Sequence, residues 1–125
     1  MTIAYMCIVI TVFIPIICAA YSKITGKNYD NTLPREFLDK LEGKAKRAHY
    51  AQLNGYEVFP PFAAAVIIAH QLHAPQHLLN NLAMGFVGAR ILYCLFYISN
   101  VPNLRTLVWF LGLFITIAIF FIGVK

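Results

Sequence analysis

An otherwise apolar part of the chain carries polar side chains at helical spacing. Arg47, Tyr50, Asn54 and Glu57 follow one another at intervals of three, four and three residues. Because residues three and four apart lie on the same face of an α-helix, these side chains are predicted to form one polar stripe.

A second stripe follows later in the chain. Arg90, Tyr93 and Tyr97 are three and four residues apart within another apolar segment. Ionisable side chains at membrane depth are costly unless they face the interior of a helix bundle or a wet cavity. The two stripes therefore predict a polar site that is shared between helices.

The apolar segments predict four helices that cross a membrane. Residues 1–22 and 106–124 contain no Asp, Glu, Lys or Arg, and each is close to the ~20 residues that a spanning helix needs. Two further apolar segments, 58–73 and 78–99, lie between them, and Arg90 is the one charged residue in the second. We expect helices at about residues 2–22, 35–73, 76–99 and 103–124. A short turn is expected between the second and the third helix.

Composition agrees with a membrane protein. Of the 125 residues, 60% are hydrophobic and 12% are charged, which is too apolar for a small soluble domain. The chain is therefore expected to be a single all-α domain embedded in a lipid bilayer. Its first apolar segment has no basic start and exceeds the ~7–15 apolar residues of a secretory signal peptide, so we expect it to remain as a spanning helix.

The charges predict which side of the membrane each loop occupies. Seven Lys or Arg residues lie between the first span and the apolar part of the second, whereas the turn at residues 74–76 has none. Lys and Arg concentrate in cytoplasmic loops, so the first connection is expected in the cytoplasm and both termini outside. This orientation and anionic lipid headgroups explain the net charge of +5 better than nucleic acid does.

The remaining reactive side chains suggest no further site. His70 and His73 could share a helix face, but Pro75 breaks the register before His77, and no acidic or Cys residue nearby in sequence completes a metal shell. We therefore expect no metal. The three cysteines lie in apolar segments, where packing is the expected role.

Three motifs of the chain stand in a recognisable order. AQLNGYEVFPPF at residues 51–62 is followed by ARILYCLFY at residues 89–97 and by NLRT at residues 103–106. Over residues 46–109 the sequence resembles the family of membrane-associated proteins in eicosanoid and glutathione metabolism, MAPEG. The resemblance implies a four-helix subunit that assembles as a homotrimer and binds glutathione between subunits. The short length is similar to that of bacterial members, which implies a bacterial inner membrane and an active site facing the cytoplasm.

The resemblance also implies which residues form the glutathione site. Arg105 would stabilise the thiolate of glutathione, and the neighbouring hydroxyl of Thr106 could hold the sulfur by a hydrogen bond. The residues expected to bind glutathione as co-substrate are Arg47, Tyr50, Asn54, Glu57, Arg90, Tyr93 and Tyr97.

These residue types suit glutathione on chemical grounds. Glutathione has two carboxylates and one amino group, so Arg47 and Arg90 can bind the carboxylates and Glu57 can receive the ammonium. A cation favours the nucleophilic thiolate over the thiol, and Arg105 is always charged. Two positions depart from the eicosanoid synthases, which have an Arg in place of Tyr50 and a Tyr in place of Val58. Both changes remove contacts to glutathione, and Arg47 could replace the first.

Simpler interpretations of the same residues remain open. Glu57 and Arg90 could form a buried ion pair between helices. Tyr93 and Tyr97 could be aromatic residues of the membrane interface, which is the role we expect for Trp109. The expected function is that of a glutathione-dependent transferase or peroxidase acting on lipophilic electrophiles. The alternative is a non-catalytic membrane protein of the same fold that binds a lipid or a small anion.

Overall fold

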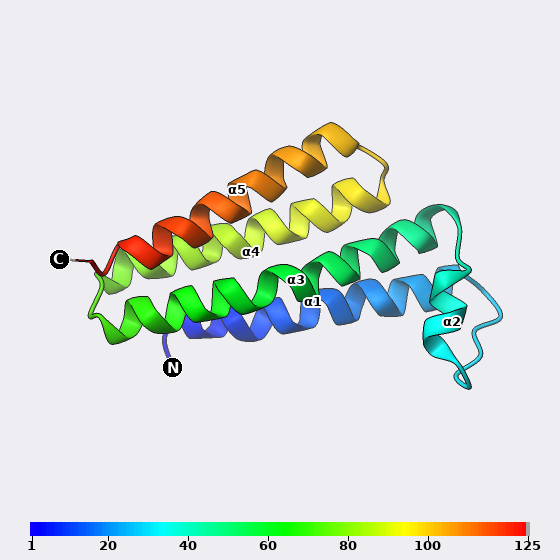
Figure 1. Ribbon diagram of the computed structural model, residues 1–125, viewed down its shortest axis with the longest axis horizontal. Helices are drawn as coiled ribbons and strands as arrows, with labels where there is room; N and C mark the ends of the chain where they lie inside the picture. The colour runs from blue at the N-terminus through cyan, green and yellow to red at the C-terminus, as the bar shows by residue number, and fades with distance from the viewer. Residues whose placement is uncertain (125) are drawn as a thin grey trace.

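The computed structural model describes residues 1–124, and these residues form helices and turns without any strand. Figure 1 shows the long helices α1 (Ile3–Thr25), α3 (Gly43–Gln71), α4 (Gln76–Ile98) and α5 (Pro102–Phe121) side by side. The short helix α2 (Pro34–Asp39) lies at one end of them. The predicted all-α class is therefore confirmed.

Three of these helices, α1, α4 and α5, are long and apolar enough to cross a membrane. Between 22% and 33% of the apolar window of each is buried inside the molecule, so most of their apolar surface faces outward. Outward apolar surface of this extent is typical of a protein surrounded by lipid. The first half of α3 carries Lys, Arg and Glu residues, and α3 does not meet the same criterion.

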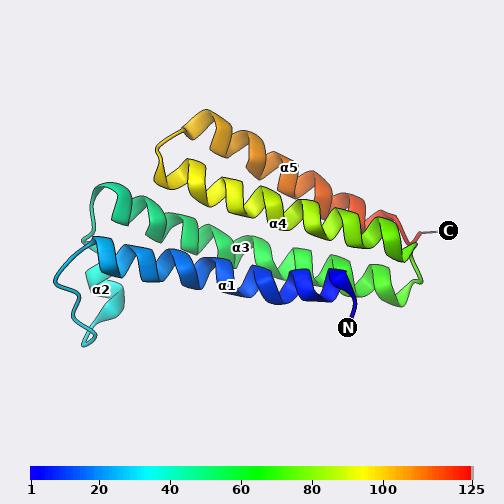
Figure 2. The same ribbon diagram turned by 180° about the vertical axis from the view of Figure 1, so that it is seen from behind.

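The long helices pack as two pairs, α1 with α3 and α4 with α5. α4 also contacts α1 and α3, and α5 also contacts α3. Figures 1 and 2 show that the α4–α5 pair diverges from the α1–α3 pair toward the end at which α2 lies. Both termini lie toward the opposite end.

The core is built from close contacts between small residues and stacked rings. The rings of Phe62 on α3 and Phe86 on α4 stack with centroids 3.9 Å apart. The buried hydroxyl of Ser22 donates to the carbonyl oxygen of Ala45 at 2.9 Å and so joins α1 to α3. Small residues let membrane helices approach closely. Those in the main cluster are Ala4, Ala65, Ala69, Ala74 and Ala83.

One predicted element is wrong, because the segment expected as a single helix over residues 35–73 is two helices. α2 begins at Pro34, but it ends at Asp39, and α3 begins only at Gly43. Gly43 has a φ of +61°, a left-handed conformation that glycine adopts without steric cost. The chain turns there, so α2 does not extend α3. Beyond this point, α3 continues through the pair of prolines at residues 60 and 61.

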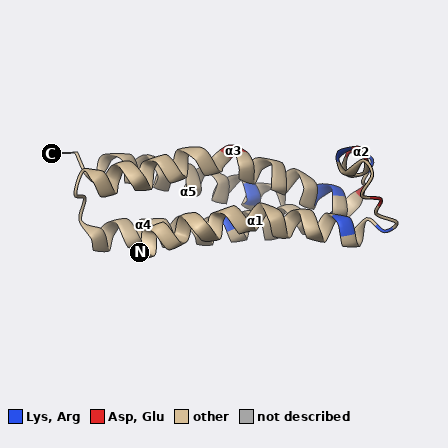
Figure 3. Cartoon of the chain, turned by 90° about the horizontal axis from the view of Figure 1, so that it is seen from below, with Lys and Arg blue, Asp and Glu red and all other residues tan. Residues whose placement is uncertain are grey.

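The basic residues gather toward the end of the molecule at which α2 lies, as Figure 3 shows. Within α2, the Nζ atom of Lys40 lies 2.8 Å from the Oε1 atom of Glu36. The hydrogen bond from Lys40 holds the pKa of the Glu36 carboxyl below its usual value. The described residues at the end with the termini carry no Lys or Arg.

Candidate functional site

A cavity of about 210 Å³ lies where α3, α4 and α5 meet, toward the end with α2. It combines the amide of α3, two phenols of α4, and the guanidinium, hydroxyl and indole at the start of α5. Five of its six lining residues are among the residues that the sequence predicts for the site. The lining residues are Asn54, Tyr93, Tyr97, Arg105, Thr106 and Trp109.

Two neighbouring tyrosines lie between two arginines along one side of this region. The Cζ atom of Arg90 lies 4.1 Å from the ring centre of Tyr93, and that of Arg105 lies 4.4 Å from the ring centre of Tyr97. The two rings meet edge to face with centroids 5.7 Å apart. A cation over an aromatic face gains about 0.5–2 kcal/mol. The rings thus orient both guanidinium groups.

The start of α5 adds a second positive influence at the cavity. α5 begins at Pro102, and no side chain caps its first turn. The unpaired N–H groups of a helix start carry a partial positive charge. Arg105 and Thr106 follow within this first part of the helix. The cavity therefore has a full and a partial positive charge on its α5 side, which suits an anion.

On the α3 side, the amide of Asn54 donates from Nδ2 to Oε2 of Glu57 at 3.2 Å. The Oδ1 atom of Asn54 is buried and finds no hydrogen-bond partner among residues 1–124. Glu57 itself is exposed on the surface of the single chain. Within the described residues it forms no ion pair with Arg90. The structure thus does not contain the buried Glu57–Arg90 pair that was open from the sequence.

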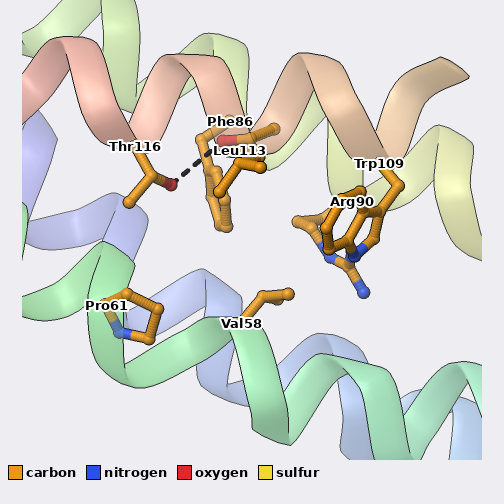
Figure 4. A pocket seen from close by; sticks show the side chains of 8 residues that line it. Val58, Pro61, Phe86, Arg90, Trp109, Leu113 and Thr116 are labelled. Carbon is orange, nitrogen blue, oxygen red and sulfur yellow. Dashed lines mark hydrogen bonds between the residues drawn. The ribbon is translucent and has the colours of Figure 1, made fainter.

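Arg90 is 3% exposed and lies deep between the helices. Its Nη2 atom has no hydrogen-bond partner among residues 1–124. Arg90 lines a second cavity of about 60 Å³, between α3, α4 and α5, which is otherwise mostly apolar. Figure 4 shows Arg90 beside Trp109 at one end of this cavity, with Val58 and Pro61 across from α5. Farther along it, the hydroxyl of Thr116 is occupied by a bond to the carbonyl of Gly112 at 3.0 Å.

Arg47 and Tyr50 lie beside the first cavity and do not line it. The Nε atom of Arg47 donates to the carbonyl oxygen of Ile98 at 3.1 Å, which ties the start of α3 to the end of α4. The ring of Tyr50 is exposed, and its centre lies 6.5 Å from that of Tyr97. Both side chains are therefore near the site. Arg47 helps to position α3 against α4.

Trp109 is the lining residue that sequence reasoning missed. We expected it at the membrane interface, but its side chain lines both cavities. Trp109 is four residues after Arg105 and so lies on the same face of α5. That spacing was the signal available in the sequence. Its indole connects the polar cavity with the apolar one.

Comparisons with curated proteins and with solved structures gave no significant match. The sequence model of the MAPEG family, in contrast, matches residues 1–125, which is the whole chain. Proteins of this family are membrane-bound and generally use glutathione, so the match implies a membrane function related to glutathione. The resemblance seen in the three motifs is thereby confirmed, and the chain belongs to the MAPEG family.

Proposed function

We propose that this protein is a glutathione-dependent transferase or peroxidase that acts on lipophilic electrophiles. The observation that carries the proposal is the 210 Å³ cavity, around which Asn54 of α3 lies together with Arg105 and Thr106 of α5. It combines a cation, hydroxyl groups and an amide where α3, α4 and α5 meet. This is the combination that binding and activating a small peptide thiol requires.

One unpartnered atom at the cavity and one behind Tyr93 support a ligand with both acceptors and donors. Arg90 offers a buried donor and Asn54 a buried acceptor, each without a partner in the described chain. Leaving such a group unsatisfied costs about 1–3 kcal/mol. A carboxylate of glutathione on Arg90 and an N–H group on Asn54 would recover that cost. Glu57 would receive the ammonium.

The proposed chemistry is thiolate attack. Arg105 and the positive end of α5 would stabilise the glutathione sulfur as an anion, and the Thr106 hydroxyl would donate a hydrogen bond to it. The sulfur then attacks the electrophilic centre of the second substrate. The mostly apolar cavity of about 60 Å³ behind Trp109 would take a small apolar part of a lipophilic substrate that enters from the bilayer. Arg47 and Tyr50 would contact the outer part of the glutathione molecule.

The exposed position of Glu57 supports an assembly of several copies. On the single chain its carboxylate faces outward from the middle of α3. A charged residue facing lipid at the centre of a membrane helix costs about 2.5–3.5 kcal/mol or more. We infer that a second copy covers this face, as in a homotrimer. α3 would then cross the membrane inside the assembly as the fourth spanning helix of a single domain.

A comparison of Arg105→Ala with Arg35→Ala tests the proposed mechanism. Arg35 is an exposed residue of α2, outside both cavities, and serves as the control. Purified protein is titrated with glutathione while thiolate absorbance and turnover of a lipophilic electrophile are recorded. Arg105→Ala should still bind glutathione but lose the thiolate signal, with turnover falling ~10²–10³-fold. Arg35→Ala should match the parent protein.

A protein with Arg105→Ala that forms thiolate and turns over at the parent rate would contradict the mechanism. A parent protein that binds no glutathione would favour the second candidate, a non-catalytic protein that binds a lipid or a small anion. The buried Arg90 with its unpartnered Nη2 atom is the observation on which that candidate rests. The localisation that we propose is a bacterial inner membrane, with the site toward the cytoplasm.

A further inference from the structure

Two of the three cysteines meet between α1 and α4. Cys18 and Cys94 belong to the same buried cluster, and both line one cavity between the two helices. Cys7 is buried in a different cluster, packed among residues of α3 and α4. The chain therefore contains one thiol pair and one separate thiol in a similar apolar setting.

An apolar cavity of about 370 Å³ lies beside the thiol pair. Two of its walls, Ile17 of α1 and Leu95 of α4, are 66% and 54% exposed, so the cavity opens on the outer surface of the molecule. Both helices are apolar enough to cross a membrane. An acyl chain of the surrounding lipid is the occupant that matches this chemistry. The remaining lining residues are Ile14, Tyr21, Ile91 and Ile98.

A buried cation lies next to the thiol pair. Arg90 precedes Cys94 by four residues, which places both on the same face of α4. A thiolate is the nucleophilic form of cysteine, and a neighbouring guanidinium stabilises it. Cys94 is therefore the better placed of the two thiols to react first.

We propose that Cys94 and Cys18 form a reactive dithiol that reduces lipid hydroperoxides held with their acyl chain in the 370 Å³ cavity. The Cys94 thiolate attacks the outer peroxide oxygen, the O–O bond breaks, and the lipid alkoxide takes a proton and leaves as an alcohol. Cys94 is then a sulfenic acid. The Cys18 sulfur attacks it, an S–S bond forms and water leaves. Two thiols are oxidised by two electrons, and one hydroperoxide is reduced to an alcohol. This reaction uses no glutathione, and Arg90 is the one residue that it shares with the site proposed above.

The test uses the full protein in phosphatidylcholine vesicles without glutathione. A fatty acid hydroperoxide is added, the corresponding lipid alcohol is quantified, and non-reduced peptides are mapped by mass spectrometry. We expect a Cys18–Cys94 cross-link and the loss of two thiols for each alcohol formed. Cys18→Ser should stop the reaction at an oxidised Cys94, and Cys94→Ser should abolish alcohol formation. Cys7→Ser is the matched control and should behave as the parent protein.

Three results would overturn the proposal. The first is a parent protein that keeps all its thiols while the hydroperoxide persists, which needs no variant to fold. The second is equally fast oxidation by hydrogen peroxide at the same concentration, because a lipid-binding cavity would then confer no advantage. The third is oxidation of Cys7 at the same rate as Cys94. A parent protein that binds no glutathione would contradict the proposed function but not the oxidation of Cys94 and Cys18. The two proposals can therefore be refuted separately.

Discussion

Replacing Gly55 by Ala should weaken the contact between α1 and α3. A Cβ atom added at Gly55 would lie 2.6 Å from Cγ and 3.3 Å from Cβ of Pro15. The proline ring is rigid and belongs to α1, so it cannot rotate away, and the two helices must separate. Overpacking of this kind costs about 1–3 kcal/mol. Alanine also favours the helix over glycine by about 1 kcal/mol, which offsets part of the loss.

Gly88→Ala provides the matched control on α4. An added Cβ at Gly88 meets no atom within 4 Å, so this variant should gain the same helix preference without a clash. The difference in unfolding free energy between the two variants therefore isolates the contact with Pro15, at about 1–3 kcal/mol. Denaturation in detergent measures this difference in unfolding free energy. A glutathione titration of both variants shows whether the site at the neighbouring Asn54 is disturbed. Equal stability of the two variants would refute the close packing of Gly55 against Pro15.

Two other predictions concern the binding site and the orientation. Glu57→Gln should leave the fold of the single chain intact, because Glu57 forms no ion pair within the described residues, but it should weaken glutathione binding about 10- to 100-fold if a charged contact of ~1.5–3 kcal/mol is lost. Unchanged binding in a titration would remove Glu57 from the site. A reporter that is active only in the cytoplasm should be inactive when fused to the carboxyl terminus. Strong activity there would overturn the expected orientation.

The periodic polar pattern predicted that residues of α3 and α4 approach one another, whereas Arg105 was expected at the site from the family resemblance. Asn54, Tyr93 and Arg105 are far apart in sequence, yet they line one cavity. Each lies toward the end of the bundle at which α2 lies, and each helix has apolar residues on its other faces. In a bundle of antiparallel helices these conditions bring the polar faces together. Periodicity therefore contains the information on the α3 and α4 side of the site, and the resemblance supplied the α5 side.

Other features depend on geometry that the pattern does not contain. The end of α2 depends on a turn at Gly43 with positive φ, and a glycine alone predicts neither that turn nor a continuous helix. Arg47 was expected to contact a carboxylate, but a carbonyl at the end of α4 lies within its reach. Whether Trp109 faces lipid or a cavity depends on the rotation of α5 about its axis. Such long-range contacts are set by packing of the whole molecule.

The same packing explains how α1 can influence the site without lining the first cavity. Gly55 brings α3 against Pro15 of α1, and Asn54, the preceding residue, lines the cavity. The position and rotation of the polar stripe of α3 relative to α4 and α5 therefore depend on the contact between Gly55 and Pro15 of α1. A shift of one reacting group by about 1 Å can cost ~10²-fold in rate. If the cavity is the catalytic site, Gly55→Ala should consequently reduce turnover by more than its effect on stability alone would explain.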